Sequence, residues 1–124
     1  MSEKVPELFG VGPVLPVHDV AKTVEFYCSM LGFELDFVMG TPPDHGSVTR
    51  GRVGIQFTLA PAEFVVTSFP GWIYIFVDNI DTLHSEYLER DVQITRPLES
   101  CEHGMRELEI QDLNGFRLRF GQYL

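Results

Sequence analysis

An internal repeat restricts the possible folds of this chain more than any other feature of its sequence. Residues 17–27 have the sequence VHDVAKTVEFY, and residues 77–87 have the sequence VDNIDTLHSEY. The apolar positions that match between the copies are Val17 with Val77, Val20 with Ile80, and Tyr27 with Tyr87. A repeat of this kind indicates two copies of one supersecondary unit, packed against each other in the same domain.

Each copy contains the signals of a helix that follows a strand. Asp19 and Asn79 are predicted N-caps, because their side-chain oxygens can accept hydrogen bonds from the free amides of the first helical turn. The apolar residues that follow recur at helical spacing, which predicts helices near residues 19–31 and 79–90. An apolar, strand-like run precedes each helix.

Three further strands are predicted after each helix. In the first copy the last two surround a turn near Gly51, and in the second they surround the turn Asp-Leu-Asn-Gly at residues 112–115, a strong hairpin signal. The sequence therefore predicts an α+β fold, in which two βαβββ modules in tandem form a single domain. The expected boundaries are 1–124 for the domain, about 9–60 for module one, 61–70 for the linker, and about 71–122 for module two.

The first strand of module two alternates large aromatic residues with aliphatic ones. Trp72, Tyr74 and Phe76 share one side of this strand, while the aliphatic residues share the other. A half-exposed strand normally carries polar residues opposite its core face. The aromatic side is therefore expected either to line a ligand cleft or to pack against a neighbouring subunit, and both hold if the cleft lies between subunits.

Composition excludes several classes of protein. The 124 residues carry 18 acidic and 9 basic side chains, for a net charge of −9, which argues against a nucleic-acid partner. No apolar run approaches the roughly 20 residues that span a bilayer, and the first residues lack a signal-peptide pattern, so we expect no membrane partner and a cytoplasmic protein. Cys28 and Cys101 form no disulfide or zinc motif and are expected to be free thiols.

Three segments together resemble the vicinal oxygen chelate superfamily, which contains glyoxalases, bleomycin-resistance proteins and extradiol dioxygenases. They are PVLPVHDVAKTVEFYCSMLGFELDF, FVDNIDTLHSEYLERDV and GMRELEIQDLNGFRLRFGQ, and the last is most similar to the bleomycin-resistance branch. The resemblance implies that the two modules curl a mixed sheet around a cleft, usually within a homodimer.

The resemblance also places the metal-ligand positions of the family at Gly12, Gln56, Trp72 and Arg119. Glycine has no donor atom, the indole offers only an N–H, and arginine keeps its proton, so Gln56 alone could coordinate a metal. Divalent metals require several carboxylate, imidazole or thiolate ligands. We therefore expect no metal at these positions, no cofactor and no catalytic residues.

The other candidate ligand-binding residues follow from strand parity. On the last strand Phe116, Leu118 and Phe120 are expected to face the helices, which leaves Arg117 and Arg119 in the cleft. Their hairpin partners Glu107 and Glu109 are expected beside them as a cross-strand ladder of ion pairs. The full set of predicted ligand-binding residues is Gly12, Val14, Gln56, Trp72, Tyr74, Phe76, Glu107, Glu109, Arg117 and Arg119. His45 and His103, in matching loops before a strand, are expected at the cleft mouths and are more simply explained as surface residues.

Three functions remain open on this basis. The first is a homodimeric protein that sequesters an aromatic or cationic small molecule without a metal, whether an antibiotic or an ordinary metabolite. The second, the main alternative, is a divergent glyoxalase- or dioxygenase-type enzyme with unrecognised ligands or with Glu107 or Glu109 as an acid–base group. The third is a dimeric module with a vestigial cleft. Fold alone does not separate them.

Overall fold

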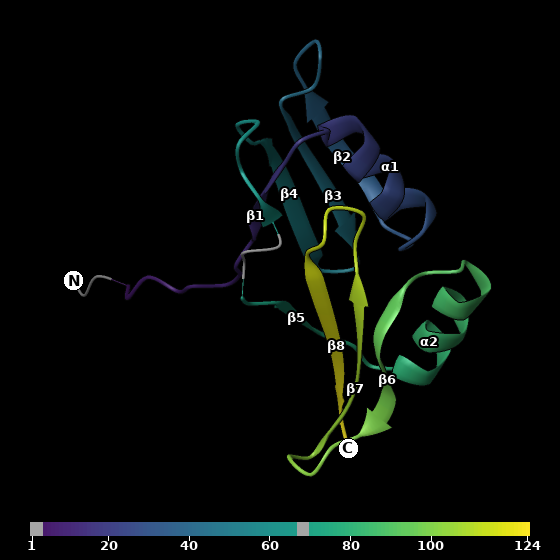
Figure 1. Ribbon diagram of the computed structural model, residues 1–124. Coiled ribbons are helices and arrows are strands. Elements are labelled where there is room, and N and C mark those ends of the chain that lie inside the picture. The colour runs from purple at the N-terminus through teal and green to yellow at the C-terminus, as the bar shows by residue number, and fades with distance from the viewer. Residues whose placement is uncertain (1–3, 67–69) are drawn as a thin grey trace.

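In the computed structural model, which describes residues 4–66 and 70–124, the same order of elements occurs twice (Figure 1). Each copy begins with a short strand, continues with a helix of ten residues, and ends with three strands. The first copy consists of β1 (Val14–Val17), α1 (Val20–Ser29), β2 (Glu34–Met39), β3 (His45–Arg50) and β4 (Val53–Leu59). The second consists of β5 (Ile73–Phe76), α2 (Ile80–Glu89), β6 (Ile94–Ser100), β7 (Met105–Gln111) and β8 (Arg117–Tyr123).

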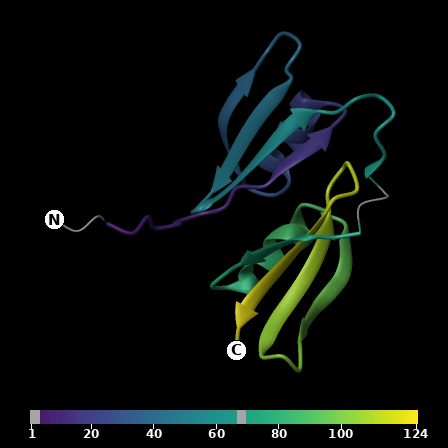
Figure 2. The ribbon, with the colours of Figure 1, turned by 90° about the vertical axis from the view of Figure 1, so that its left-hand side faces the viewer.

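The strands form two mixed sheets of four strands, one in each module. The order is β1-β4-β3-β2 in the module-one sheet and β5-β8-β7-β6 in the module-two sheet. The first strand of each module pairs in parallel with the last, and the other pairs are antiparallel. The prediction of two βαβββ modules is confirmed. Figure 2 shows the side of the molecule away from the helices, where one face of each sheet is uncovered.

The helices begin at the predicted caps. The Asp19 carboxylate accepts a hydrogen bond from the amide of Lys22 at 3.0 Å, and the Asn79 side chain accepts one from the amide of Thr82 at 3.4 Å. A second contact holds the start of α2, since Gln122 of β8 accepts a hydrogen bond from the amide of Ile80 at 2.8 Å. After α1 the chain turns at Gly32, whose φ of 74° suits a residue without a side chain.

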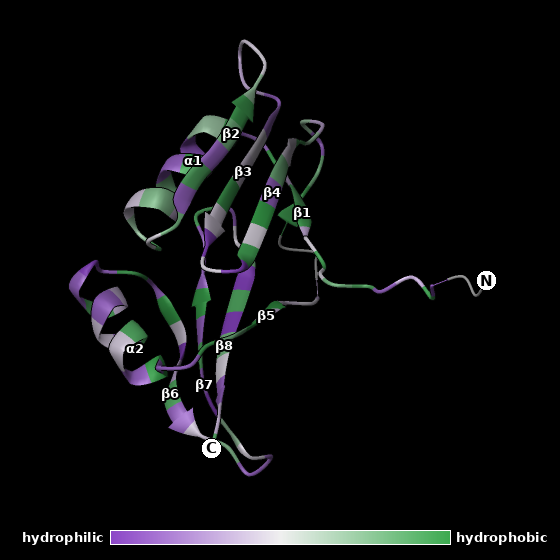
Figure 3. Cartoon of the chain, turned by 180° about the vertical axis from the view of Figure 1, so that it is seen from behind, coloured by the Kyte–Doolittle hydropathy of each residue, from purple (hydrophilic) through white to green (hydrophobic). Residues whose placement is uncertain are grey.

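One hydrophobic core runs through both modules between the helices and the sheets. Alternate residues of the strands point into it, and Figure 3 shows this alternation of hydrophobic and hydrophilic residues along β8. As predicted, Phe116, Leu118 and Phe120 are buried on the helix side. The largest completely buried side chains include Tyr27 and Tyr87, which are equivalent residues of the two helices.

Polar contacts across the module boundary follow the internal repeat. The hydroxyl of Tyr27 in α1 donates to Asp112, in the β7–β8 turn of module two, at 2.7 Å. The hydroxyl of Tyr87 in α2 donates to the carbonyl of Leu31, in module one, at 3.0 Å. Each helix therefore uses its tyrosine to contact the other module. Bonds of this kind tie the two modules into one folded unit.

The chain before β1 extends away from the body of the molecule (Figure 1). Its apolar side chains are among the most exposed in the structure: Val5, Leu8, Phe9 and Val11 are each at least 82% exposed. Gly12 lies in this extended segment, two residues before β1, and a side chain at this position would meet nothing within 4 Å. No helix in the described ranges, 4–66 and 70–124, is long and apolar enough to cross a membrane.

Candidate functional site

The candidate site is the face of the module-two sheet that α2 leaves uncovered, here called the open face. It consists of Trp72, Tyr74, Phe76, Thr95, Glu107, Glu109, Arg117, Arg119 and Tyr123. Trp72 is 45% exposed and Phe76 is 60% exposed, so the aromatic side of β5 does not belong to the core. Seven of the ten residues predicted to bind a ligand lie on this face. The side chains of the open face form three rows that run across the strands.

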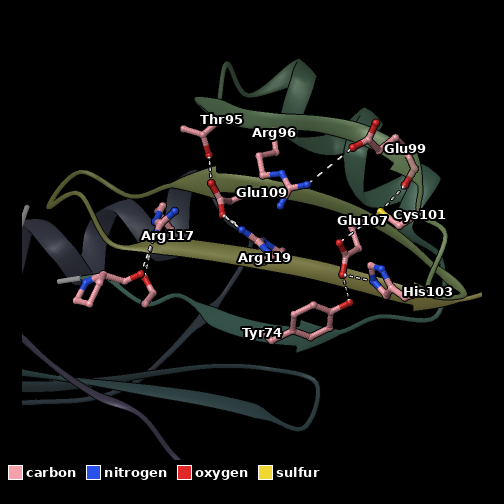
Figure 4. Close-up of polar contacts among 12 residues, drawn as sticks. Tyr74, Thr95, Arg96, Glu99, Cys101, His103, Glu107, Glu109, Arg117 and Arg119 are labelled. Atoms are coloured by element: carbon pink, nitrogen blue, oxygen red, sulfur yellow. Dashed lines mark hydrogen bonds and ion pairs between the residues drawn. The ribbon is translucent and has the colours of Figure 1, made fainter.

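The first row joins an indole to an ion pair. The guanidinium of Arg119 lies over the Trp72 ring, 3.9 Å from its centre, which is a cation–π geometry. The same guanidinium donates to Glu109 at 2.9 Å, and the hydroxyl of Thr95 donates to the other oxygen of this carboxylate at 2.8 Å (Figure 4). Glu109 is only 2% exposed, and these two partners replace the water that its carboxylate loses on burial. The ion pair predicted between Arg119 and Glu109 is present.

The second row is centred on Glu107, which is 7% exposed. One oxygen of its carboxylate accepts a bond from the Tyr74 hydroxyl at 2.5 Å and lies 3.2 Å from Nε2 of His103. The other oxygen lies 3.5 Å from Sγ of Cys101 (Figure 4). Burial opposes the charged form, but the hydrogen bonds from these three groups outweigh it and lower the pKa of Glu107. Burial and the bond to Glu107 raise the pKa of Tyr74.

Tyr74 can reach Glu107 because of a glycine on the intervening strand. Gly121 lies opposite Glu107 in the β7–β8 pairing, and the Tyr74 ring passes directly above it. A methyl group at position 121 would overlap the tyrosine hydroxyl and ring. Glycine at this position therefore allows the second row to form.

The third row is aromatic and lies at the far end of the face. The rings of Phe76 and Tyr123 stack with an interplanar angle of 12° and centres 5.6 Å apart. Tyr123 was not predicted as a site residue, although it has the same strand parity as Arg119. The predicted strand ended before Tyr123, so this residue was not considered as part of the site.

Two predictions about this face are wrong. Glu107 was expected beside an arginine, but its partner in the register is Gly121, and it is bound by Tyr74 instead. Arg117 was expected to join the ladder of ion pairs, but its guanidinium donates to the carbonyl oxygens of Pro70 at 2.9 Å and Gly71 at 3.4 Å. The carbonyls lie just before β5 and attract this side chain toward the linker.

The remaining predicted residues lie in module one and away from these rows. Gln56 of β4 pairs with Val14 of β1, and its side-chain oxygen lies 2.7 Å from Nε2 of His45. His45 was expected in a loop, but it is the first residue of β3, and its ring stacks on Phe37 with centres 5.8 Å apart. The polar contacts of Gln56 and of Arg119 thus stay within their own modules.

The four positions where the family places metal ligands do not fit a metal in this chain. Gln56 has the one suitable donor atom, and His45 already contacts it. Arg119 repels a cation less than its charge suggests, because Glu109 neutralises it. The donor set still falls short of what a divalent ion requires.

One cavity in the described part of the chain lies between the modules. It measures about 280 Å³ and is lined by Phe33, Arg50, Val53, Ile75, Phe76, Val77, Asp78, Asn79, Thr82, Leu83, Glu86, Tyr87 and Phe120. Phe76 is the one predicted residue in that lining. Beside Glu107 and Arg119 the hollow in a single chain is too small to hold a water molecule, so the open face is a surface there and not an enclosed pocket.

Comparison with known proteins places the chain in a family. The model of the Glyoxalase/Bleomycin resistance protein/Dioxygenase superfamily matches residues 11–120, so the chain belongs to this superfamily. No curated protein sequence matched the chain.

Among solved structures, the chain is similar to the bleomycin-binding protein of bleomycin-producing Streptomyces verticillus, complexed with copper(II)-bleomycin. The TM-score is 0.76 at 27% identity, over 94% of this chain and 97% of that one. It also resembles TioX from Micromonospora sp. ML1, with a TM-score of 0.76 at 20% identity over 93% of this chain and 100% of the other. A glyoxalase-related enzyme from Clostridium phytofermentans gives 0.75 at 23% identity, over 98% and 100%. The last two share the fold.

Proposed function

We propose that this chain is a small-molecule binding protein, which holds an aromatic or cationic ligand on the open face without chemical change. The observation that carries the proposal is the half-exposed indole of Trp72, held beside the Arg119–Glu109 pair. An aromatic face gives stacking and cation–π attraction to a flat or charged ligand. The net charge of −9 adds long-range attraction for cations.

A second copy of the chain completes the site in this proposal. The open face is not enclosed within one chain, and it carries the exposed rings of Trp72, Phe76 and Tyr123. Val14 and Leu59 of module one are also about half exposed. Apolar surface of this kind is normally covered by a partner or a ligand. A homodimer would cover it and convert an open surface into a cleft.

The similarity to the Streptomyces verticillus protein supports this function, since that structure is described as a bleomycin-binding protein. Antibiotic resistance is the corresponding biological role. The alternative, a divergent glyoxalase or dioxygenase, is less favoured because Gln56 is the single donor at the family's metal positions and Glu109 is occupied by Arg119 and Thr95.

Ligand binding can be measured by the fluorescence of Trp72, which is the one tryptophan in the sequence. Bleomycin, free and as its copper(II) complex, is the first probe, followed by a set of aromatic cations. A ligand that stacks on the indole should change this emission and raise the melting temperature, because binding to the native state stabilises it.

The variant Trp72→Ala should weaken ligand binding by about 1–3 kcal/mol, as expected for the loss of one aromatic contact. Calorimetry follows binding in this variant, which has no tryptophan. Leu88→Ala is the matched control, because Leu88 is an exposed apolar residue of α2 that lies outside the open face. Equal affinity in the Trp72 variant and the wild type would refute the proposed site. Turnover of a glyoxalase or catechol substrate that a chelator abolishes would favour the enzyme.

A further inference from the structure

A cluster of side chains that could hold a metal ion lies at the end of the open face, in the turn between β6 and β7 and on β7 itself. It consists of Cys101, His103 and Glu107, whose ligand atoms all lie within 4.8 Å of one another. None of these residues occupies a position where the family places its metal ligands. The cluster is thus a separate feature of this chain.

The distances within the cluster suit a single small cation. Sγ of Cys101 lies 3.5 Å from one oxygen of Glu107, and Nε2 of His103 lies 3.2 Å from the other. Ligands bound tetrahedrally to zinc, with bonds of about 2.0–2.3 Å, are separated from each other by about 3–4 Å. One ligand atom from each of the three residues lies within 4.8 Å of the other two, so each pair has to close by about 1 Å at most to reach this range.

The backbone holds the donors in place. The amide of Cys101 donates to the carbonyl of Met105 at 2.7 Å, and the amide of Gly104 donates to the carbonyl of Cys101 at 3.3 Å. Gly104 has a φ of 84°, which allows the tight turn that brings His103 back toward the strand. The ligand atoms come from a closed hairpin turn and the strand that follows it, so they are positioned before an ion binds.

Glu107 is also oriented by a residue that would not itself touch the metal. The hydroxyl of Tyr74 donates to the carboxylate at 2.5 Å, as groups outside the coordination sphere do in many metal sites. His103 is 59% exposed while Glu107 is 9% exposed, measured on the side chains. The cluster is thus buried on the sheet side and open toward solvent, which leaves room for a fourth ligand.

We propose that Cys101, His103 and Glu107 form a binding site for a divalent transition metal of the zinc class. Thiolate, imidazole and carboxylate are the ligand types that zinc combines, and three protein ligands with one open position are typical of sites that bind water or an exogenous ligand. Calcium and magnesium are disfavoured, because they require a shell of oxygen ligands. The metal site shares Glu107 with the open face, and the cobalt titration tests it whether or not that face binds a small molecule.

Cobalt(II) is the probe for this site, because it takes the place of zinc and absorbs visible light. The purified chain is stripped with a chelator, kept reduced, and titrated with cobalt(II). One equivalent should produce a thiolate-to-cobalt charge-transfer band in the near ultraviolet and the intense visible bands of tetrahedral cobalt. Zinc should displace the cobalt and remove both.

Two variants and one control assign the ligands. Cys101→Ser should abolish the charge-transfer band, and His103→Ala should weaken cobalt binding by about tenfold or more, at least as much as the loss of an outer-shell partner. Cys28→Ser, which changes the other cysteine, should leave the titration unchanged. Equal melting temperatures of the metal-free proteins would show that the variants fold. Absence of the band in the wild type, its persistence in Cys101→Ser, or unchanged affinity in His103→Ala would overturn the proposal.

Discussion

The repeat provides two equivalent tyrosines whose hydroxyl groups bind acceptors of different charge. Tyr27 and Tyr87 are both completely buried, and each donates to the other module. The acceptor of Tyr27 is the carboxylate of Asp112, whereas that of Tyr87 is the backbone carbonyl of Leu31. Burial raises the pKa of both tyrosines, so both remain protonated donors.

Replacing either tyrosine with phenylalanine removes one hydroxyl and keeps the ring. A hydrogen bond to a charged group contributes about 1.5–3 kcal/mol, and a bond between neutral groups about 0.5–1.5 kcal/mol. Tyr27→Phe should therefore reduce the free energy of unfolding by about 1.5–3 kcal/mol at neutral pH. Tyr87→Phe should cost about 0.5–1.5 kcal/mol, since the Leu31 carbonyl keeps a second donor in Arg50 at 2.8 Å.

The two variants should also differ in their response to pH. Burial raises the pKa of the Asp112 carboxyl above its ordinary 3.8, although the bond from Tyr27 and those from backbone amides lower it. Ionisation of Asp112 therefore costs stability as the pH rises through its folded pKa, and the Tyr27 hydroxyl reduces that cost. Loss of the hydroxyl raises the pKa of Asp112 further in Tyr27→Phe, so the penalty should be full above the pKa of the variant and should shrink as the pH falls toward that of the wild type. The penalty of Tyr87→Phe should stay constant over the same interval.

Urea unfolding at equal protein concentration, followed from neutral pH down to about pH 4, measures both effects. Wild type, the two single variants and the double variant are compared at each pH. An equal cost of Tyr87→Phe and Tyr27→Phe at neutral pH would contradict a charged acceptor at Asp112. A difference between the two variants that does not change with pH would contradict it as well.

Two further predictions concern the open face and the assembly. Gly121→Ala should displace Tyr74 from Glu107 and lower the melting temperature, whereas Gly54→Ala, at a strand glycine whose added methyl group would approach no atom closer than 3.9 Å, should lower it little. An equal loss in the two variants would contradict the close approach of Tyr74. In sedimentation at micromolar concentration the main species should have twice the 14.1 kDa mass of the chain, and a purely monomeric sample would contradict the homodimer.

The sequence predicts the architecture well because its signals are local. The caps Asp19 and Asn79 each bond to an amide three residues away, and the alternation of β8 determines which of its residues enter the core. The aromatic side of β5 was predicted for the same reason. The spacing of apolar residues and the position of a helix cap depend on residues that are close together in the chain. They can therefore be predicted from one sequence.

The partners within the open face could not be predicted with the same success. Glu107 has the expected orientation, but which side chain binds it depends on the strand register and on the space above Gly121. The contact of Cys101 with Glu107 depends on how the β6–β7 turn closes. The odd or even position of a residue along a strand predicts which face of the sheet its side chain points to. The side chains that it meets on neighbouring strands depend on the tertiary structure.

The parallel pairing of β5 with β8 determines when the open face can exist during protein synthesis. β5 lies at one edge of its sheet, and among the described residues its strand partner is β8, at residues 117–123. A ribosome therefore completes Trp72, Tyr74 and Phe76 long before their strand has anything to pair with. Pairing between segments so far apart in sequence is slow, and it exposes apolar side chains in the meantime. The face that we propose for ligand binding can therefore assemble only after residues 117–123 have been synthesised.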